Sequence, residues 1–219
     1  MDLGEVEPDD TIAGAVRKPT RIQIRNQERI LDGALTVFAA NGFRGATVDQ
    51  LAKAAGMTKP NLLYYYRSKK DLYVAVLELV LARWLDPLEQ LDPDGDPAEQ
   101  ILTYMRAKLA MSKDRPEDSR LYANEILNGA PLLGEVLTGH LKILVEKKAV
   151  VLRHWCETGK LNPVDPHHLI FMLWATTQHY ADFEVQVSAL LGADKRDDTF
   201  TNAQNTLETV LMNGLLPRH

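Results

Sequence analysis

Residues 58–64 carry the side chains of this chain that are best suited to recognise another molecule. Thr58, Lys59, Asn61 and Tyr64 follow one another within about two helical turns. An asparagine can pair bidentately with adenine, and a lysine can donate to guanine or to phosphate. A helix N-terminus, where Thr58 stands, attracts phosphate because its backbone N–H groups are free. These residue types at this spacing indicate a surface that reads the major groove of DNA.

Three residues around this surface, Thr47, Tyr65 and Lys69, are candidates for contacts to the phosphate backbone, which fix register without reading sequence. Charge supports the same segment. Residues 17–70 hold 11 Lys and Arg against three Asp and Glu, a net charge of +8, whereas the whole chain has −5. A basic cluster is usually only a solvated face, but here charge, spacing and capping residues agree, which favours nucleic acid as the partner.

Capping residues predict the helices that position these side chains. Thr47 and Gln50 have the spacing of a capping box, which opens a short helix that Gly56 ends. Thr58 then caps a second short helix to about residue 66, and Ser68 caps a longer one to about residue 89. The pattern is that of a helix-turn-helix between about Thr47 and Tyr66.

Packing residues fit this motif. Two helices that cross at a tight turn need a small residue where they approach and a glycine at the turn, and Ala52 and Gly56 meet these demands. Apolar residues from Ile30 to Ala39 recur at helical spacing and predict a preceding helix, which ends at Asn41–Gly42. The inward face of the motif is expected to consist of Leu51, Ala55, Met57 and Leu62.

The remainder of the chain also predicts helices, at roughly 97–113, 116–128, 131–158, 166–191 and 197–214, separated by Pro and Gly. No segment alternates at period two for long enough to be a strand. The expected fold is all-α, with an N-terminal three-helix helix-turn-helix domain and a C-terminal helical ligand-binding and dimerisation domain. We expect a disordered tail over 1–20, the DNA-binding domain over 21–68 and the helical body over 69–219.

The body contains candidates for a ligand site. On the helix predicted from residue 166, Phe171, Trp174 and Gln178 lie on one face, which places rings beside an amide. Aromatic residues of apolar helices are more often core, but burying the amide without a partner would cost about 1–3 kcal/mol. We therefore predict that Trp174 and Gln178 bind a ligand, with Trp84 as a second wall. Candidates without an assigned role are Tyr73, Met105, Lys108 and Asn124.

Composition excludes several other classes of protein. The single cysteine, Cys156, excludes an internal disulfide framework, and no Cys/His cluster has zinc spacing. The acidic N-terminus differs from a secretory signal, and the longest apolar run, over residues 169–175, is too short to span a membrane. We expect a cytoplasmic protein without metal or cofactor.

Two other functional classes compete with a DNA-binding regulator. An enzyme would need some of Cys156, His154, His167, His168, His179 and Asp182 as a catalytic or metal site. His168 and His179 are about 16 Å apart along a helix, too far to share a metal, and no catalytic residue is predicted. The other class is a helical adaptor that binds protein and never DNA. Steep weakening of DNA binding by salt would separate the two.

The segment around the predicted motif resembles the TetR family of regulators over about 45 residues. Three positions depart from the family pattern: Pro60 replaces a glycine, Leu63 a tyrosine and Tyr66 a phenylalanine. Pro60 in a first helical turn is harmless. The resemblance rests on Ala34-Leu35, Phe38, Gly42-Phe43, Thr47-Val48, Leu51-Ala52, Ala55-Gly56, Met57-Thr58-Lys59, Tyr65-Tyr66 and the run from Lys69 to Leu72.

Within that family the chain is similar to regulators of pyrimidine utilisation, through residues 61–65, 129–133, 137–139 and above all 166–183. This resemblance implies a homodimer of repressor type, released from its double-stranded DNA operator by uracil, thymine or a related pyrimidine. A small apolar ligand is the alternative effector. The family architecture also implies that the last two long helices pair with their copies, and their apolar content is compatible with this.

Overall fold

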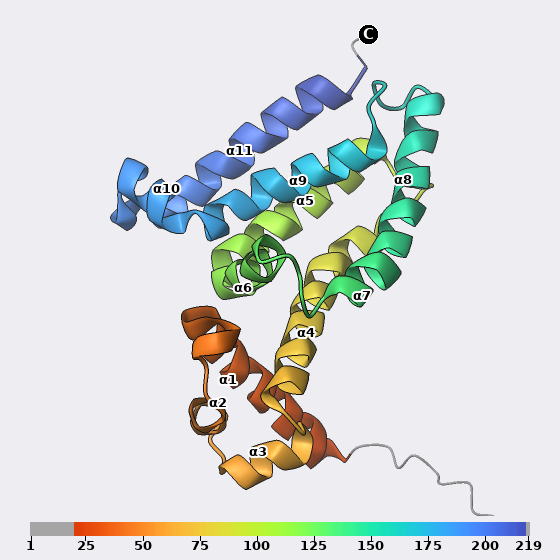
Figure 1. Cartoon of the computed structure of the whole chain (residues 1–219). Helices are drawn as coiled ribbons and strands as arrows, with labels where there is room; N and C mark the ends of the chain where they lie inside the picture. Colours follow the sequence, from red (N-terminus) through yellow and green to blue (C-terminus); the bar gives the residue numbers. More distant parts are fainter. Residues whose placement is uncertain (1–19, 218–219) are drawn as a thin grey trace, which may run out of the picture.

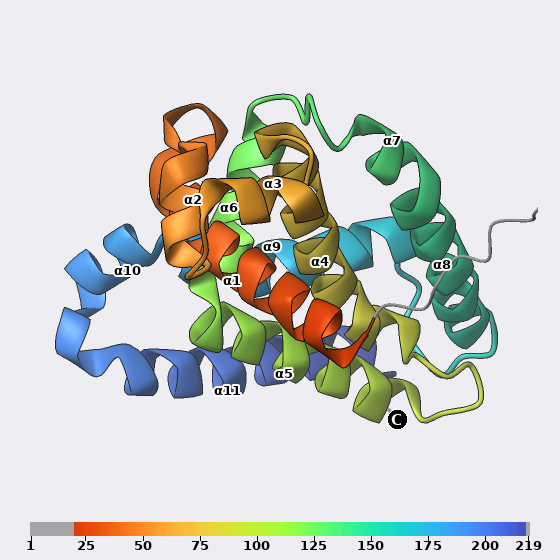
Figure 2. The same cartoon turned by 90° about the horizontal axis from the view of Figure 1, so that it is seen from below.

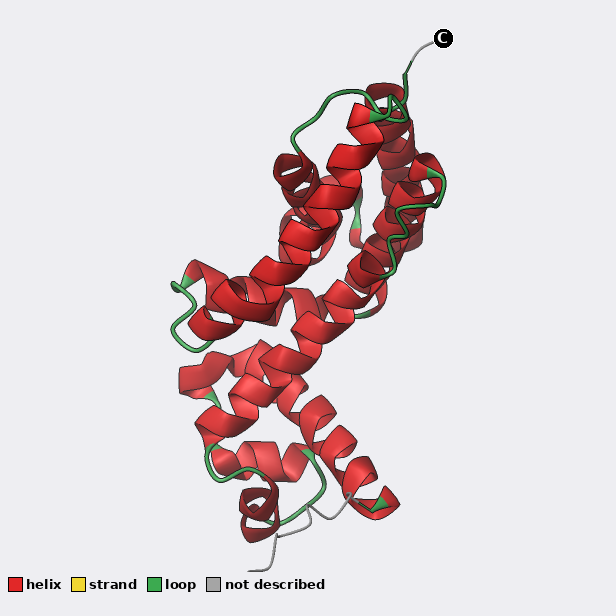
Figure 3. Cartoon of the chain, turned by 90° about the vertical axis from the view of Figure 1, so that its right-hand side faces the viewer, coloured by secondary structure: helices red, strands yellow, loops and turns green. Residues whose placement is uncertain are grey.

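The structure is a computed structural model, and it describes residues 20–217. The predicted tail therefore lies outside the described residues except for Thr20. Within the described range every regular element is a helix (Figure 3). The prediction of an all-α fold is confirmed.

The first three helices are α1 (Arg21–Gly45), α2 (Val48–Ala54) and α3 (Lys59–Tyr65). The predicted caps are present: the Thr47 side chain accepts from the backbone of Gln50, and the Gln50 side chain accepts from the backbone N–H of Thr47 at 2.9 Å. Thr58 caps α3 in the same way, through the N–H of Asn61. Gly56 adopts φ +63°, which only glycine tolerates well, and so turns the chain between α2 and α3.

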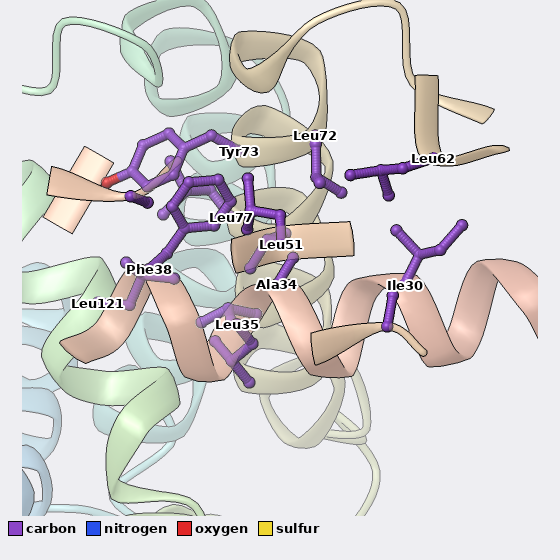
Figure 4. Close-up of a cluster of buried hydrophobic side chains, with 14 of the residues drawn as sticks. Ile30, Ala34, Leu35, Phe38, Leu51, Leu62, Leu72, Tyr73, Leu77 and Leu121 are labelled. Atoms are coloured by element: carbon purple, nitrogen blue, oxygen red, sulfur yellow. The ribbon is translucent and has the colours of Figure 1, made fainter. Parts of the chain in front are cut away.

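These helices share one apolar core with the body of the molecule. Phe38 of α1, Leu51 of α2 and Leu62 of α3 are fully buried. Figure 4 shows that Leu77 and Leu121, which come from later helices, point into the same cluster. The first three helices and the body thus share one core. Because a close-packed core transmits strain, a movement of the body also shifts the packing of the first three helices.

Helices α1 and α2 approach each other closely at Gly33. A Cβ at this position would lie 2.8 Å from the carbonyl carbon of Ala54, a distance that real side chains do not reach. Ala52, the small residue predicted at the crossing, is buried at 3% exposure. Gly33 of α1 therefore has to be a glycine, because α2 passes too close for a side chain. This role of Gly33 was not predicted from the sequence.

The body follows the motif and is arranged as Figure 1 shows. Helix α4 rises from the first three helices, α5, α9 and α11 run side by side across the body, and α10 projects from it (Figure 1). Its elements are α4 (Lys69–Glu89), α5 (Pro97–Asp114), α6 (Pro116–Leu127), α7 (Gly134–Val136), the π-turn η1 (Leu137–Leu141), α8 (Lys142–Glu157), α9 (Pro166–Asp182), α10 (Glu184–Leu191), the 3₁₀ turn η2 (Ala193–Lys195) and α11 (Arg196–Leu215).

Two long helices expected from the sequence are interrupted. The segment predicted as one helix over 131–158 contains η1, where Gly139 leaves helical geometry with φ −94° and ψ −106°. The segment over 166–191 breaks at Phe183, which has φ −113° and separates α9 from α10. Both predictions were wrong because apolar residues continue through the breaks, so periodicity alone carries no signal of them.

Polar contacts join the body to the first three helices. Arg83 of α4 lies 3.4 Å from Asp32 of α1 and 3.5 Å from the buried carboxylate of Asp118 on α6. The hydroxyl of Tyr73 donates to Glu125 of α6 at 3.1 Å. Helices α4 and α6 both contact α1 and contact each other, so the two together connect the body to the first three helices.

Candidate DNA interface and effector cavity

The predicted reading surface lies on the outer face of α3. Thr58, Lys59 and Asn61 are exposed, and Tyr64 is 75% exposed, whereas Leu62 between them is buried. Figure 2 views the molecule from below and shows α3 next to the beginning of α1. One helix therefore anchors itself in the core by its inner face and leaves its polar outer face free for a partner.

Two of the DNA-contact candidates already have internal partners that leave donors available. The Lys59 ammonium lies 3.2 Å from Asp49 of α2, and both side chains are largely exposed. The Tyr65 hydroxyl accepts a hydrogen bond from Asn26 at 2.8 Å. Because the oxygen of Tyr65 is an acceptor there, its own O–H proton remains able to donate to a phosphate.

Thr47 and Lys69 are engaged within the domain. The Thr47 hydroxyl is part of the α2 cap and donates to Gln50 at 2.9 Å. The Lys69 ammonium donates to the carbonyls of Phe43 and Ala46, both at 2.8 Å, where α1 ends. Two of its three donors are thereby used. The phosphate contact expected of Lys69 remains a prediction that relies on the third donor.

The three residues predicted to bind a ligand come together around one cavity. Trp84 of α4 and Trp174 and Gln178 of α9 line one narrow cavity between α4, α5 and α9. Its volume is about 30 Å³, room for about two water molecules, so a ring enters only when the side chains around the cavity move apart. The remaining lining residues are Val80, Leu81, Leu85, Lys108, Tyr122 and Leu141.

A hydrogen bond to α5 fixes the position of the Trp174 side chain. Its indole N–H donates to the hydroxyl of Tyr104 on α5 at 2.6 Å, and Tyr104 is 2% exposed. Burial raises the pKa of Tyr104, so this phenol stays neutral. Since the indole N–H has its partner inside the protein, Trp174 offers the cavity a flat apolar face.

A lysine lies against the other tryptophan. The Lys108 ammonium of α5 is 3.3 Å from the centroid of the Trp84 ring, and the residue is 3% exposed. Burial lowers the pKa of Lys108 well below its ordinary value, while Asp182 acts in the opposite direction. The cavity thus combines two aromatic walls with a buried amine and the amide of Gln178.

An open groove on the surface begins where the cavity ends. Tyr122 and Gln178 line both, and the groove continues between α6 and the end of α9 past Asp182. The Asp182 carboxylate accepts a hydrogen bond from Ser119 at 2.5 Å, and burial raises its pKa. The shared residues make the groove a route by which a small molecule could reach the cavity.

No role for Lys108 was predicted from the sequence, although the spacing of its neighbours indicates that it is buried. Ile101, Tyr104 and Lys108 follow one another at helical spacing, and the first two are fully buried. A lysine on an apolar stripe is therefore expected to be buried. Of the other unassigned candidates, Met105 lies in the core, Tyr73 contacts Glu125, and Asn124 lines only the outer groove.

The comparisons with known proteins cover both parts of the chain. A family model for bacterial regulatory proteins of the tetR family matches residues 30–76, and one for the C-terminal region of YcdC-like proteins matches residues 77–218. The HTH-type transcriptional regulator RutR of Escherichia coli (strain K12) is 46% identical over 209 residues, covering 94% of this chain and 99% of RutR. The chain belongs to the TetR family. It is a ligand-responsive, DNA-binding transcriptional regulator.

Solved structures agree with this family. Protein SCO4942 from Streptomyces coelicolor superimposes with a TM-score of 0.70 at 26% identity and covers 86% of this chain and 97% of its own. The fatty acid degradation regulator FadR from Bacillus halodurans superimposes with a TM-score of 0.62 at 20% identity, and the match covers 88% of this chain and 96% of the FadR chain. At that identity the likeness shows the fold alone, so the effector of this TetR-family chain must be argued from its own cavity.

Within residues 20–217 no group of three or more His, Cys, Asp or Glu could hold a metal ion. Cys156, the candidate nucleophile of an enzyme, lies with its sulfur 3.4 Å from the carbonyl oxygen of Asn162. No helix in the described range is long and apolar enough to cross a membrane.

Proposed function

We propose that this chain is a regulator of the repressor type. It dissociates from DNA when a small planar ring, of the uracil or thymine type, binds in the cavity between α4, α5 and α9. The observation that carries the proposal is the position of Trp84. Its side chain lines the cavity and also belongs to the apolar cluster that contains Phe38 and Leu62 of the DNA-binding part. A ligand that moves Trp84 therefore disturbs the apolar cluster to which Leu62 of α3 belongs.

Cavity chemistry supports a pyrimidine as the effector. A uracil ring has flat faces that suit Trp84 and Trp174, and its edge places a carbonyl acceptor beside an N–H donor. The amide of Gln178 offers the complementary donor and acceptor. The Gln178 side chain has no hydrogen bond to any described residue. The pyrimidine as effector rests on these residues and on the sequence resemblance.

A small apolar ligand is the second candidate. Val80, Leu81, Leu85 and Leu141 line the same cavity, and an apolar ring would bury itself among them. Binding of toluene in preference to uracil would favour this alternative.

On the DNA side, we propose that Thr58, Lys59, Asn61 and Tyr64 contact bases and the adjoining phosphates, and that Thr47, Tyr65 and Lys69 contact the phosphate backbone. The exposed outer face of α3 supports this assignment. Such a protein acts in the cytoplasm, where the DNA is, and its body serves as a sensor and not as an enzyme.

We further propose a homodimer built on α9 and α11. Apolar residues on the outer faces of this part of the body are exposed, among them Met172 (43%), Phe183 (53%) and Val210 (63%). A twofold dimer places two α3 helices about 34–36 Å apart, which matches one turn of DNA and a near-palindromic operator. Light scattering on the purified chain gives its mass, and a monomer at micromolar concentration would contradict the dimer.

The experiment that tests the proposed function starts by sequencing the genomic DNA fragments that the purified protein retains. Binding to the recovered fragment is then measured against salt, and log K should fall by about 0.9 for each phosphate neutralised. Addition of uracil or thymine should release the fragment. Retention of no specific fragment at low salt would overturn the regulator, whereas retention without release by any ring compound would overturn the effector.

A further inference from the structure

Lys108 differs from an ordinary buried lysine in having nothing to donate to. Its ammonium lies on the face of Trp84 and lines the cavity, and within residues 20–217 it has no hydrogen bond and no ion pair. A buried amine without an acceptor is costly, because it has lost water and gained no partner. The donors of Lys108 are therefore available to whatever fills the cavity.

A second buried lysine provides the comparison. Lys148 of α8 is 5% exposed, close to the 3% of Lys108. Its ammonium donates to the carbonyls of Glu89 and Leu91, each at 2.8 Å. The fold thus satisfies one buried lysine with backbone acceptors and leaves the other facing a cavity.

The surroundings of Lys108 contain few charges. Asp182 of α9 faces it at a distance beyond an ion pair, and this carboxylate is already hydrogen-bonded by Ser119 of α6. Tyr122 of α6 lines the same cavity, and burial raises the pKa of its phenol to about 12. From α4 the facing side chain is the uncharged Trp84. No group packed around Lys108 supplies the close acceptor that an ammonium needs.

We propose that Lys108 binds a hydrogen-bond acceptor of the effector, either a ring carbonyl or an anionic ring oxygen, and so makes the cavity select acceptor-bearing rings over apolar rings of the same shape. This inference rests on the proposed function in taking the cavity as the effector site. Gln178 of α9 and Lys108 of α5 lie on different helices that line the cavity, so they can hold different parts of one ring between the two tryptophans.

Proton uptake accompanies such binding. In the empty cavity, burial lowers the pKa of Lys108, so the amine is more easily neutral. An acceptor within hydrogen-bond distance favours the ammonium and raises that pKa again. Binding of the effector therefore takes up protons, and affinity falls as the pH rises from the lowered pKa of Lys108 in the empty protein to the higher pKa that it has in the complex.

Calorimetry on the full-length protein tests this inference with three probes: uracil for the carbonyl, barbiturate for the anionic ring, and toluene for the apolar ring. Each titration is run in phosphate and in Tris, because the difference in heat between the buffers counts the protons taken up. Lys108→Met keeps the length of the side chain and removes its donors. The matched control is Lys142→Met, at an exposed lysine of α8.

The inference predicts that uracil or barbiturate binds the wild type with proton uptake, that Lys108→Met lowers this affinity by roughly tenfold or more and abolishes the uptake, and that toluene does not discriminate between the two proteins. Thermal unfolding verifies that Lys108→Met is folded. Unchanged affinity and unchanged uptake in Lys108→Met would overturn the inference and leave the proposed function standing. Failure of all three probes to bind the wild type would overturn the proposed function as well.

Discussion

The outer face of α3 and the cavity in the body both present polar side chains to a partner, but they do so in opposite environments. Tyr64 is 75% exposed, and Thr58, Lys59 and Asn61 of the same surface are also exposed, whereas Trp84 is 6% and Lys108 3% exposed. Solvated side chains contribute little to folding, so α3 can be shaped for DNA without loss of stability. Buried side chains are part of the core, so residues that line the cavity must serve both the stability of the fold and the binding of a ligand.

Trp84→Ala should produce the largest effect, because it removes a buried indole from both the core and the cavity. We expect a loss of about 3–5 kcal/mol in the free energy of unfolding, measured by urea denaturation. Tyr64→Ala is the control, and its free energy of unfolding should change by no more than about 0.5 kcal/mol. Equal losses in the two variants would break the comparison between the buried and the exposed surface.

Gly33→Ala should destabilise the DNA-binding part, because its Cβ would lie 2.8 Å from the backbone of Ala54. Helix α1 must then move away from α2, at a cost of about 1–3 kcal/mol. Thermal unfolding and DNA affinity should both decline. Gly134→Ala provides the control, since a Cβ there meets nothing within 4 Å. If Gly33→Ala changed neither the melting temperature nor the DNA affinity, α1 and α2 would have space for a methyl group where they cross.

Asn61→Ala should weaken binding to the retained DNA fragment by about 1–3 kcal/mol and relax the preference for one base pair. Its melting temperature should stay unchanged because Asn61 is exposed. Fluorescence anisotropy on the fragment and on single-base variants measures both quantities. A uniform loss on all variants would instead place Asn61 against a phosphate.

Lys108→Met should raise the melting temperature at neutral pH by about 2–4 °C, although it is expected to weaken effector binding. Burial lowers the pKa of Lys108 in the folded state, so the unfolded chain binds the proton more tightly. Wild-type stability should therefore rise with pH between the lowered and the ordinary value, and the variant should lack this contribution. Scanning calorimetry at several pH values measures it, and an identical pH dependence in both proteins would contradict the burial of an unpaired amine.

Asp49→Asn should give the smallest change. It removes the carboxylate that lies 3.2 Å from the Lys59 ammonium and leaves that charge free for DNA. Because both side chains are largely exposed, the pair is weak, and DNA affinity should increase by up to about fivefold at low salt. Weaker binding would indicate that Asp49 positions Lys59 for its contact.

The sequence predicted most about the DNA-binding part because its signals are local. Thr47, Gln50 and Thr58 cap helices within three residues of themselves, and Gly56 turns the chain in place. The cavity was harder to predict. The spacing on α9 placed Trp174 near Gln178, but the contribution of α5 depends on how three helices pack together. Lys108 was therefore left unassigned, and the breaks at Gly139 and Phe183 had no signal in an apolar pattern that continues through them.

The central claim is that a ring compound bound between α4, α5 and α9 releases α3 from DNA. The most direct measurement is the fluorescence anisotropy of the labelled DNA fragment in complex with the protein during a titration with uracil, in wild type and in Gln178→Ala. The account predicts that the anisotropy of the wild-type complex falls to that of free DNA, while the Gln178→Ala complex persists at the same uracil concentration. A wild-type complex that binds uracil by calorimetry and yet retains its DNA would contradict it.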